Sequence, residues 1–269
     1  MSEFSQRLID RSGYLGEGFA DVYDRYRPGP PESVLDVLAF VAGVERASLV
    51  IDLGCGTGLD AVHLARHGRR VVATDWSAKM VERTAARAAD AGVTARVDAR
   101  RVGAHELRLL DGAKDGRFDG AYSNLGPLNC VPDLPEHAAQ CARLVRPGGH
   151  LVFTVIGRIC PWEYLYYRWR RPERARIRAA RGPVAVGMNG HTIWTSYYRP
   201  REFYAAFAAG FELVEFRALS LFLPPPYLVR WYERHPRFFE TLGRLDDVTG
   251  GWPGLRNAGD HFLMVMRRR

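Results

Sequence analysis

The stretch from Leu49 to Gly58, LVIDLGCGTG, constrains the fold of this chain more than any other. An apolar run rich in β-branched residues ends in Asp52, and Gly54, Gly56 and Gly58 follow at alternate positions. A helical spacing of apolar residues comes next, so the order is typical of a strand, a tight turn and a helix. A side chain at these glycines would obstruct the turn or the approach of a ligand to backbone N–H groups. The pattern therefore predicts a cofactor-binding loop of the Rossmann kind.

A second acidic residue, Asp75, ends the next predicted strand, RVVATD. An acidic side chain there is placed to accept hydrogen bonds from two ribose hydroxyls. The third glycine comes one residue earlier than in a dinucleotide fingerprint, and Asp52 suits a ligand that carries an ammonium group, not a pyrophosphate. Trp76 is a candidate to lie against the adenine ring, with ordinary packing as the alternative. The two acids together indicate a nucleoside cofactor with an amino group.

The run from Asp52 to Gly58, D-x-G-x-G-x-G, resembles motif I of the class I S-adenosylmethionine-dependent methyltransferases. The resemblance extends over about Tyr14 to Ile156, with a looser match at the C-terminus. It implies an α/β fold: a seven-stranded, mostly parallel, doubly wound sheet with an antiparallel last strand. S-adenosylmethionine is the implied cofactor and S-adenosylhomocysteine the implied product. The expected later strands are 95–102, 117–123, 150–156, 211–218 and 261–266.

The expected organisation is an N-terminal lid segment, 1–31, followed by one methyltransferase domain, 32–269. At 269 residues and 47% hydrophobic content, two independent domains would be crowded. Two insertions, at about 158–199 and 220–259, exceed what the minimal fold needs. Similar Y-D-x-Y-R-P segments begin small bacterial members of the family, which makes Tyr23 and Arg27 candidates to reach the methionine carboxylate.

Further cofactor contacts follow from the resemblance at the third and fourth strand ends. The family commonly places an Asp after the third strand to bind the adenine amino group. This chain has Gly103-Ala104-His105 there, so Ala104 backbone groups or the His105 side chain are expected to substitute. Ser123 and Asn124 end the fourth strand, which faces the transferable methyl in the family. Asn129, in the same loop, is a candidate substrate contact, with a turn-forming role as the alternative.

Both insertions leave from the edge of the sheet that carries the glycine loop, so we expect them to roof the substrate pocket. The first is rich in aromatic residues, of which Trp162, Trp194 and Tyr197 are candidate substrate contacts. It also holds an arginine-dense predicted helix with Arg168, Arg170, Arg171, Arg174, Arg176, Arg178 and Arg181. A solvated helix face, with Glu163 and Glu173 pairing three or four residues away, is one interpretation. A nucleic acid, an anionic lipid surface or an acidic small molecule is the other.

Methyl transfer to a hydroxyl or a protonated amine needs a base, whereas a carboxylate acceptor needs none. Of eight histidines, His191 in the first insertion and His261 at the start of the last strand are the candidate catalytic residues. The four cysteines show neither C-x-x-C spacing nor an accompanying histidine cluster, so we expect reduced thiols and no metal site.

The sequence thus predicts transfer of a methyl group to an oxygen or nitrogen of a small molecule, with bacterial secondary metabolism as one expected setting. An RNA methyltransferase and a non-catalytic S-adenosylmethionine-binding protein are the alternatives. The formal charge of +8 allows an anionic partner, but only two of the 38 basic residues are lysines, which also fits a coding bias toward arginine. No apolar run is long enough to span a membrane and no signal pattern begins the chain, so a cytoplasmic location is expected. The sequence indicates no oligomeric state.

Overall fold

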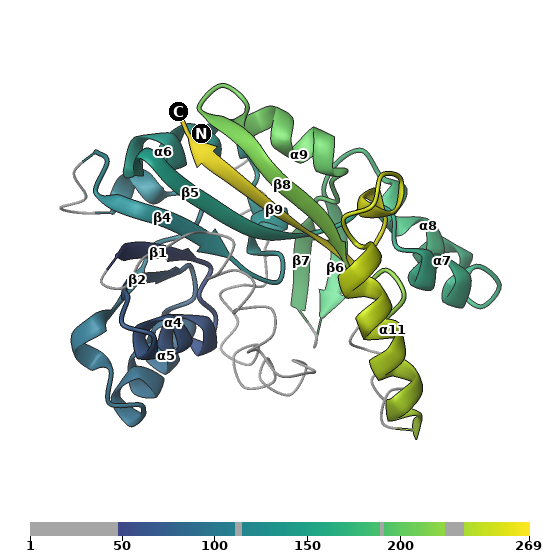
Figure 1. The fold of residues 1–269 in the computed structure, drawn as a ribbon, viewed down its shortest axis with the longest axis horizontal. Helices are drawn as coiled ribbons and strands as arrows, with labels where there is room; N and C mark the ends of the chain where they lie inside the picture. The colour runs from purple at the N-terminus through teal and green to yellow at the C-terminus, as the bar shows by residue number, and fades with distance from the viewer. Residues whose placement is uncertain (1–47, 111–114, 189–190, 224–233) are drawn as a thin grey trace.

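The structure is a computed structural model that describes residues 48–110, 115–188, 191–223 and 234–269 (Figure 1). Seven strands form one sheet in the order β3-β2-β1-β4-β5-β9-β8. The strands are β1 (Leu49–Leu53), β2 (Arg70–Asp75), β3 (Val97–Arg101), β4 (Phe118–Ser123), β5 (Val145–Ile156), β8 (Phe211–Leu219) and β9 (His261–Arg268). β1 to β5 run parallel, and β9 is antiparallel to both of its neighbours. The predicted fold class is confirmed.

Helices cover both faces of this sheet. One face carries α4 (Leu59–Arg66) and α5 (Ala78–Asp90), and the other carries α6 (Leu134–Leu144) and α9 (Pro200–Phe207) (Figure 1). The larger core lies under α6 and α9, where Phe153, Phe203 and Phe207 are almost fully buried and their rings pack edge-on or stacked. Short 3-10 turns are η3 (Thr94–Arg96), η4 (Leu107–Leu109) and η5 (Pro127–Cys130). The sheet is therefore a doubly wound, three-layer frame.

The first insertion is not a single arginine-dense helix. It contains α7 (Pro161–Tyr167), α8 (Pro172–Arg176), η6 (Ile177–Ala179) and a separate two-stranded antiparallel sheet of β6 (Val184–Met188) and β7 (His191–Thr195). Pro172, at the start of α8, explains the break, because its ring excludes the preceding residue from a helical conformation. The second insertion contributes α11 (Pro236–Thr249) and η8 (Leu255–Asn257). Figure 1 shows α7, α8 and α11 at the same end of the molecule, beyond β8 and β9.

The carboxyl edge of the parallel strands gathers the candidate residues. β1, β2 and β4 end beside the predicted cofactor residues, and antiparallel β9 begins at this edge with His261 opposite Ile156 of β5. Within the described ranges, no helix combines the length and the apolar character needed to cross a bilayer.

Candidate active site

The glycine loop between β1 and α4 folds as the sequence predicts. Gly54, Gly56 and Gly58 have φ angles of 80°, 54° and 79°, in the left-handed region that glycine adopts without strain. A Cβ on Gly54 would lie 2.4 Å from Cβ of Pro127, and one on Gly58 would lie 2.8 Å from Cα of Thr84. Thr84 also donates from Oγ1 to the Gly56 carbonyl oxygen at 3.0 Å. The loop is thus clamped between α5 and the turn that follows β4.

Asp52, the acid before the glycines, is 2% exposed at the end of β1. Tyr122 lies beside it on β4 and donates its hydroxyl to Oδ2 of Asp52 at 2.7 Å. Burial and the neighbouring carboxylate raise the pKa of Tyr122 well above its ordinary value, so the phenol remains a donor. The Asp52 carboxylate is therefore held in place as a fixed negative charge at the loop.

Asp75, at the end of β2, faces the same loop. Its Oδ2 accepts from the Gly56 backbone N–H at 3.0 Å, and its Oδ1 accepts from the Ser77 N–H at 2.9 Å. Each carboxylate oxygen has a second lone pair, so both can still accept from ribose hydroxyls. Burial raises the pKa of Asp75 to about 6, although hydrogen bonds from the backbone N–H groups of Ser77, Gly56 and Trp76 oppose the shift.

This raised pKa predicts pH-dependent cofactor binding. Protonated Asp75 loses acceptor capacity, so we expect the dissociation constant for S-adenosylmethionine to increase as the pH falls through about 6. A one-unit fall below the pKa corresponds to about a tenfold loss of affinity. Calorimetry between pH 7.5 and pH 5 measures this change, and the Asp75→Asn variant is expected to bind more weakly with a flatter profile. An equally steep profile in that variant would assign the titration to another group.

At the expected adenine position, Trp76 and His105 pack against each other with ring centroids 4.8 Å apart. Burial and the nearby Arg108 lower the pKa of His105 to about 4, so the imidazole is neutral at physiological pH. Nε1 of Trp76 and Nε2 of His105 are buried and have no hydrogen-bond partner among the described residues. The Ala104 carbonyl accepts from Nδ1 of buried His137 at 2.7 Å. Nε2 of His105 lies 3.7 Å from Oε2 of Glu106, whereas the indole N–H of Trp76 keeps an unused donor where the resemblance places adenine. Adenine binding by the Ala104 backbone or the His105 side chain stays a prediction.

The loop after β4 is braced by a buried polar network. Asn124 donates from Nδ2 to Oδ2 of Asp60 on α4 at 2.9 Å, and its Oδ1 accepts from the Thr154 hydroxyl at 2.8 Å. Oγ1 of Thr154 accepts the Leu125 N–H at 2.6 Å. Leu125 has a φ of 62°, a conformation that a branched residue adopts at a cost and that marks functional loops. Ser123, in contrast, donates to the Leu53 carbonyl at 2.7 Å and is fully buried.

Asn129 ties this loop to the rest of the edge. Its side chain exchanges hydrogen bonds with the backbone N–H and C=O of Ile156 and donates to the Ser196 carbonyl. The side chain is 1% exposed, and its hydrogen bonds reach residues 27 and 67 positions away, so they brace distant segments and do not form a local turn. A substrate contact by Asn129 stays a prediction.

His261 forms a pair with its preceding residue. Nδ1 of His261 lies 3.0 Å from Oδ2 of Asp260, so the ring can donate a hydrogen bond from Nδ1 to this carboxylate. Burial disfavours ionised Asp260, but His261 and Arg178 together hold its pKa well below the usual range. The geometry is that of a histidine base oriented by a carboxylate.

His261 lies on the same sheet face as Asp52 and Asp75. A hydrophobic cluster on that face includes Val50, Tyr122, Val152 and Leu263. Side chains alternate along a strand, so residues two positions away share the face. The polar members at its carboxyl edge are Asp52, Asn124, Thr154 and His261. β9 lies two strand spacings from β4, on the order of 10 Å, with β5 between them.

The aromatic residues predicted to line the pocket have varied surroundings. Trp162 donates from Nε1 to the Phe222 carbonyl at 2.6 Å and so joins the two insertions. Tyr197 is buried beneath the Arg178 guanidinium, 5.3 Å from its ring centroid. Nε1 of Trp194 on β7 is buried without a hydrogen-bond partner in the described part of the chain. These substrate contacts stay predictions, and Trp194 retains an unused donor.

Three other predicted residues lack a described side chain. His191 opens β7, opposite Met188, and only its backbone is described. Tyr23 and Arg27 lie outside the described residues. Their predicted roles are neither supported nor opposed by the structure.

The expectation for the arginines of the first insertion is wrong at Arg178. This residue is 8% exposed and pairs with Glu163, which lies 15 residues away and not three or four. Three other guanidinium groups lie over aromatic rings: Arg168 over Trp169, Arg170 over Tyr166 and Arg174 over Tyr167.

Several supporting residues were missed from sequence: Thr84, Tyr122, Asp60 and Asp260. Asp260 was discoverable, because it directly precedes a histidine at the predicted active edge. The other three carry no local signal, since each acts on a residue from a distant strand or loop.

Comparisons with known proteins agree with this geometry. A family described as "Methyltransferase domain" matches residues 50–149. A ubiquinone biosynthesis O-methyltransferase of Alkalilimnicola ehrlichii is 32% identical over 62% of this chain and 62% of its own length. One of Hahella chejuensis is 30% identical over 65% of this chain and 69% of its own length. A putative S-adenosylmethionine-dependent methyltransferase of Listeria monocytogenes has a TM-score of 0.62 at 12% identity, covering 87% of this chain and 96% of that one.

The chain belongs to the class I S-adenosylmethionine-dependent methyltransferases. It spans less than two thirds of the length of the Alkalilimnicola relative. The residues present fit the family's cofactor: two buried carboxylates flank a left-handed glycine loop, and the indole N–H of Trp76, next to Asp75, has no hydrogen-bond partner among the described residues.

Proposed function

We propose that this protein transfers the methyl group of S-adenosylmethionine to a hydroxyl oxygen of a small molecule. The observation that carries the proposal is the Asp260–His261 pair, with 3.0 Å between Oδ2 and Nδ1, at the edge of the sheet that holds Asp52 and Asp75. A hydroxyl must lose its proton when it attacks, so a base on the acceptor side favours oxygen over an acceptor that is already ionised. The names of the two curated relatives support the same choice.

The cofactor supplies an electrophilic methyl group on its sulfonium. Asp52 would bind the amino group, Asp75 would accept from the ribose hydroxyls, and Trp76 and His105 would contact the adenine. His261 accepts the acceptor's hydroxyl proton at Nε2, while Asp260 keeps the proton on Nδ1 and stabilises the resulting imidazolium. The two insertions exclude water and align the acceptor oxygen with the methyl group, which an in-line displacement requires.

The acceptor that we propose has an apolar body and a hydroxyl group. The unpaired indole N–H of Trp194 offers a hydrogen bond at the wall formed by the first insertion. Such a molecule belongs either to secondary metabolism or, as the relatives' names indicate, to ubiquinone biosynthesis. The RNA alternative loses support because Arg178 is buried and three neighbouring arginines lie over aromatic rings.

A panel of acceptors tests this proposal. Purified protein is incubated with S-adenosylmethionine and matched phenols, catechols, anilines, benzoic acids and structured RNA, and mass spectrometry identifies the methylated product. We expect S-adenosylhomocysteine to form with hydroxyl acceptors and their O-methyl ethers to appear in equal amount. Product only from amines or RNA, or tight cofactor binding with no product from any acceptor, would contradict the proposal.

A further inference from the structure

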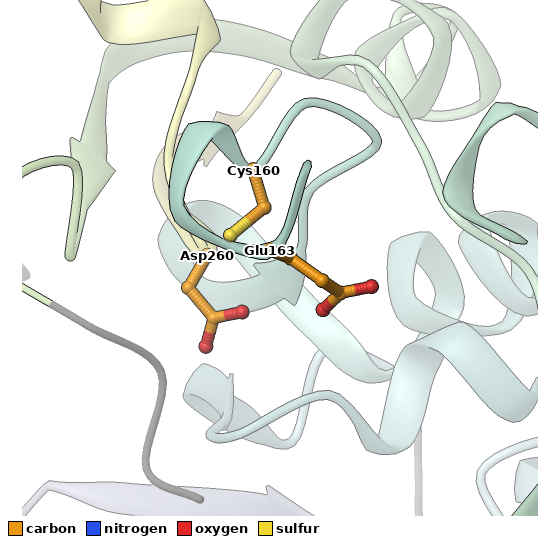
Figure 2. A group of neighbouring side chains, drawn as sticks. All are labelled: Cys160, Glu163 and Asp260. Carbon is orange, nitrogen blue, oxygen red and sulfur yellow. The ribbon is translucent and has the colours of Figure 1, made fainter. Parts of the chain in front are cut away.

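A cluster of acidic groups lies where the first insertion meets the start of β9. Figure 2 shows Cys160, Glu163 and Asp260 gathered around the beginning of α7, with the two carboxylates near one another. Their ligand atoms lie within 4.8 Å of one another, an arrangement that in isolation resembles a cation site. The cation is supplied by the chain itself, because the Arg178 guanidinium binds both carboxylates.

Every N–H of that guanidinium has a partner. Nε donates to Oε2 of Glu163 at 3.0 Å, and Nη2 donates to the same oxygen at 2.7 Å and to Oδ1 of Asp260 at 2.6 Å. Nη1 donates to the carbonyls of Gly157 and Asp260, both at 3.0 Å. These five contacts match the five donors of an arginine side chain. A metal ion is therefore not needed, and burial raises the pKa of Cys160 to about 12, which keeps it a neutral thiol.

Asp260 is shared between two partners. Its Oδ1 binds Arg178, which comes from the inserted segment, and its Oδ2 binds the His261 ring, which we propose as the base. Arg178 also donates hydrogen bonds to two backbone carbonyls at this edge of the sheet, that of Gly157 after β5 and that of Asp260 before β9. The Asp260 carboxylate, which orients His261, is thus held in place by Arg178. Arg178 reaches this carboxylate only when the first insertion packs against the start of β9.

We propose that Arg178 is a positioning residue that couples docking of the inserted segment to assembly of the Asp260–His261 pair. This inference rests on the proposed role of His261. The insertion then does more than roof the pocket, because its guanidinium completes the charge arrangement behind the base. Without Arg178, two carboxylates would lie uncompensated in a buried cluster and Asp260 would be free to turn away from the ring.

The charges of the cluster set the direction of the expected effect. The titratable and charged groups that face one another are Arg178, Glu163, Asp260, Cys160, Tyr197 and His261. Removing the guanidinium leaves more negative charge beside His261 and favours its protonated form. Removing the Glu163 carboxylate does the opposite.

The test compares Arg178→Gln, Arg178→Lys and Glu163→Gln, with Arg174→Gln as the matched control on exposed α8. For Arg178→Gln we expect kcat to fall about tenfold, with cofactor affinity within about twofold of wild type by calorimetry. In the plot of kcat against pH, the acidic limb should move at least about half a unit to higher pH. Lysine keeps the charge but not the forked geometry, so Arg178→Lys should recover most of the shift and part of kcat. Glu163→Gln should move the limb to lower pH, and Arg174→Gln should change nothing.

An NMR titration of the His261 ring in the same variants measures how Arg178 affects the protonation of His261, and this measurement does not require methyl transfer. If His261→Gln remains fully active, the base assignment fails, yet a shifted His261 midpoint in Arg178→Gln still supports the coupling. Should Arg178→Gln not fold, Arg178→Lys and Glu163→Gln decide the matter by the opposite direction of their shifts. Unshifted profiles and midpoints in folded variants, or a loss confined to KM, would reduce Arg178 to an anchor of the insertion and overturn the proposal.

Discussion

His261→Ala is expected to lower kcat by about 10²- to 10⁴-fold, the range that removal of a general base produces. In the proposed mechanism the imidazole receives the acceptor's proton at Nε2, and no other described side chain is paired with Asp260 in a way that replaces it. Cofactor affinity is expected to stay within about twofold of wild type, because β9 lies beyond β4 and β5 from the cofactor acids. Initial rates with a hydroxyl acceptor, together with calorimetry for S-adenosylmethionine, measure the two effects separately.

The matched control is His150→Ala. His150 lies on β5, the strand that pairs with β9, but at the opposite end of the sheet, where it faces Arg267. Loss of an imidazole there should leave kcat near the wild-type value. A small effect of His261→Ala, comparable to that of His150→Ala, would mean that the acceptor is already ionised or that another residue removes the proton.

The parts of this fold that the sequence predicted are those with local signals. The glycine triplet and the acid at each strand end are both readable within a few residues. The last strand was predicted over 261–266, and in the structure it runs from His261 to Arg268. Its antiparallel direction came from the resemblance and was not contained in the residues themselves.

The unpredicted parts depend on contacts between distant segments. In one of the two interpretations of the basic helix, Arg178 was a solvated arginine like its neighbours. No residue near it in the sequence indicates a buried partner. Its carboxylate, Asp260, lies 82 residues away and becomes adjacent only when the insertion folds back onto β9. The hydrogen bond from the Asn124 amide to Asp60, 64 residues away, likewise has no local signal, and a cofactor contact by Asn124 stays a prediction. Burial of a charged group is a property of tertiary packing, so amino-acid type and spacing alone do not reveal it.

Gly58→Ala is expected to weaken S-adenosylmethionine binding at least about tenfold, or about 1.4 kcal/mol. Two effects combine at this position. A residue with a Cβ is strained at a φ of 79°, and that Cβ would lie 2.8 Å from the backbone Cα of Thr84. A backbone atom of α5 cannot rotate away as a side-chain tip can, so either the loop or the helix must shift. The shift displaces the Gly56 backbone N–H, which donates a hydrogen bond to Oδ2 of Asp75. That hydrogen bond connects the glycine loop, which follows Asp52, to Asp75.

Gly92→Ala separates the two effects. Gly92 also has a left-handed φ, 68°, but a Cβ there would meet no atom within 4 Å. We expect this variant to lose about 1 kcal/mol of folding stability from backbone strain alone and to bind the cofactor as wild type does. Gly58→Ala should lose more stability than Gly92→Ala in urea unfolding, and it alone should lose affinity in calorimetry. Equal stability losses with unchanged cofactor affinity in both variants would show that the contact between Gly58 and Thr84 does not shape the binding loop.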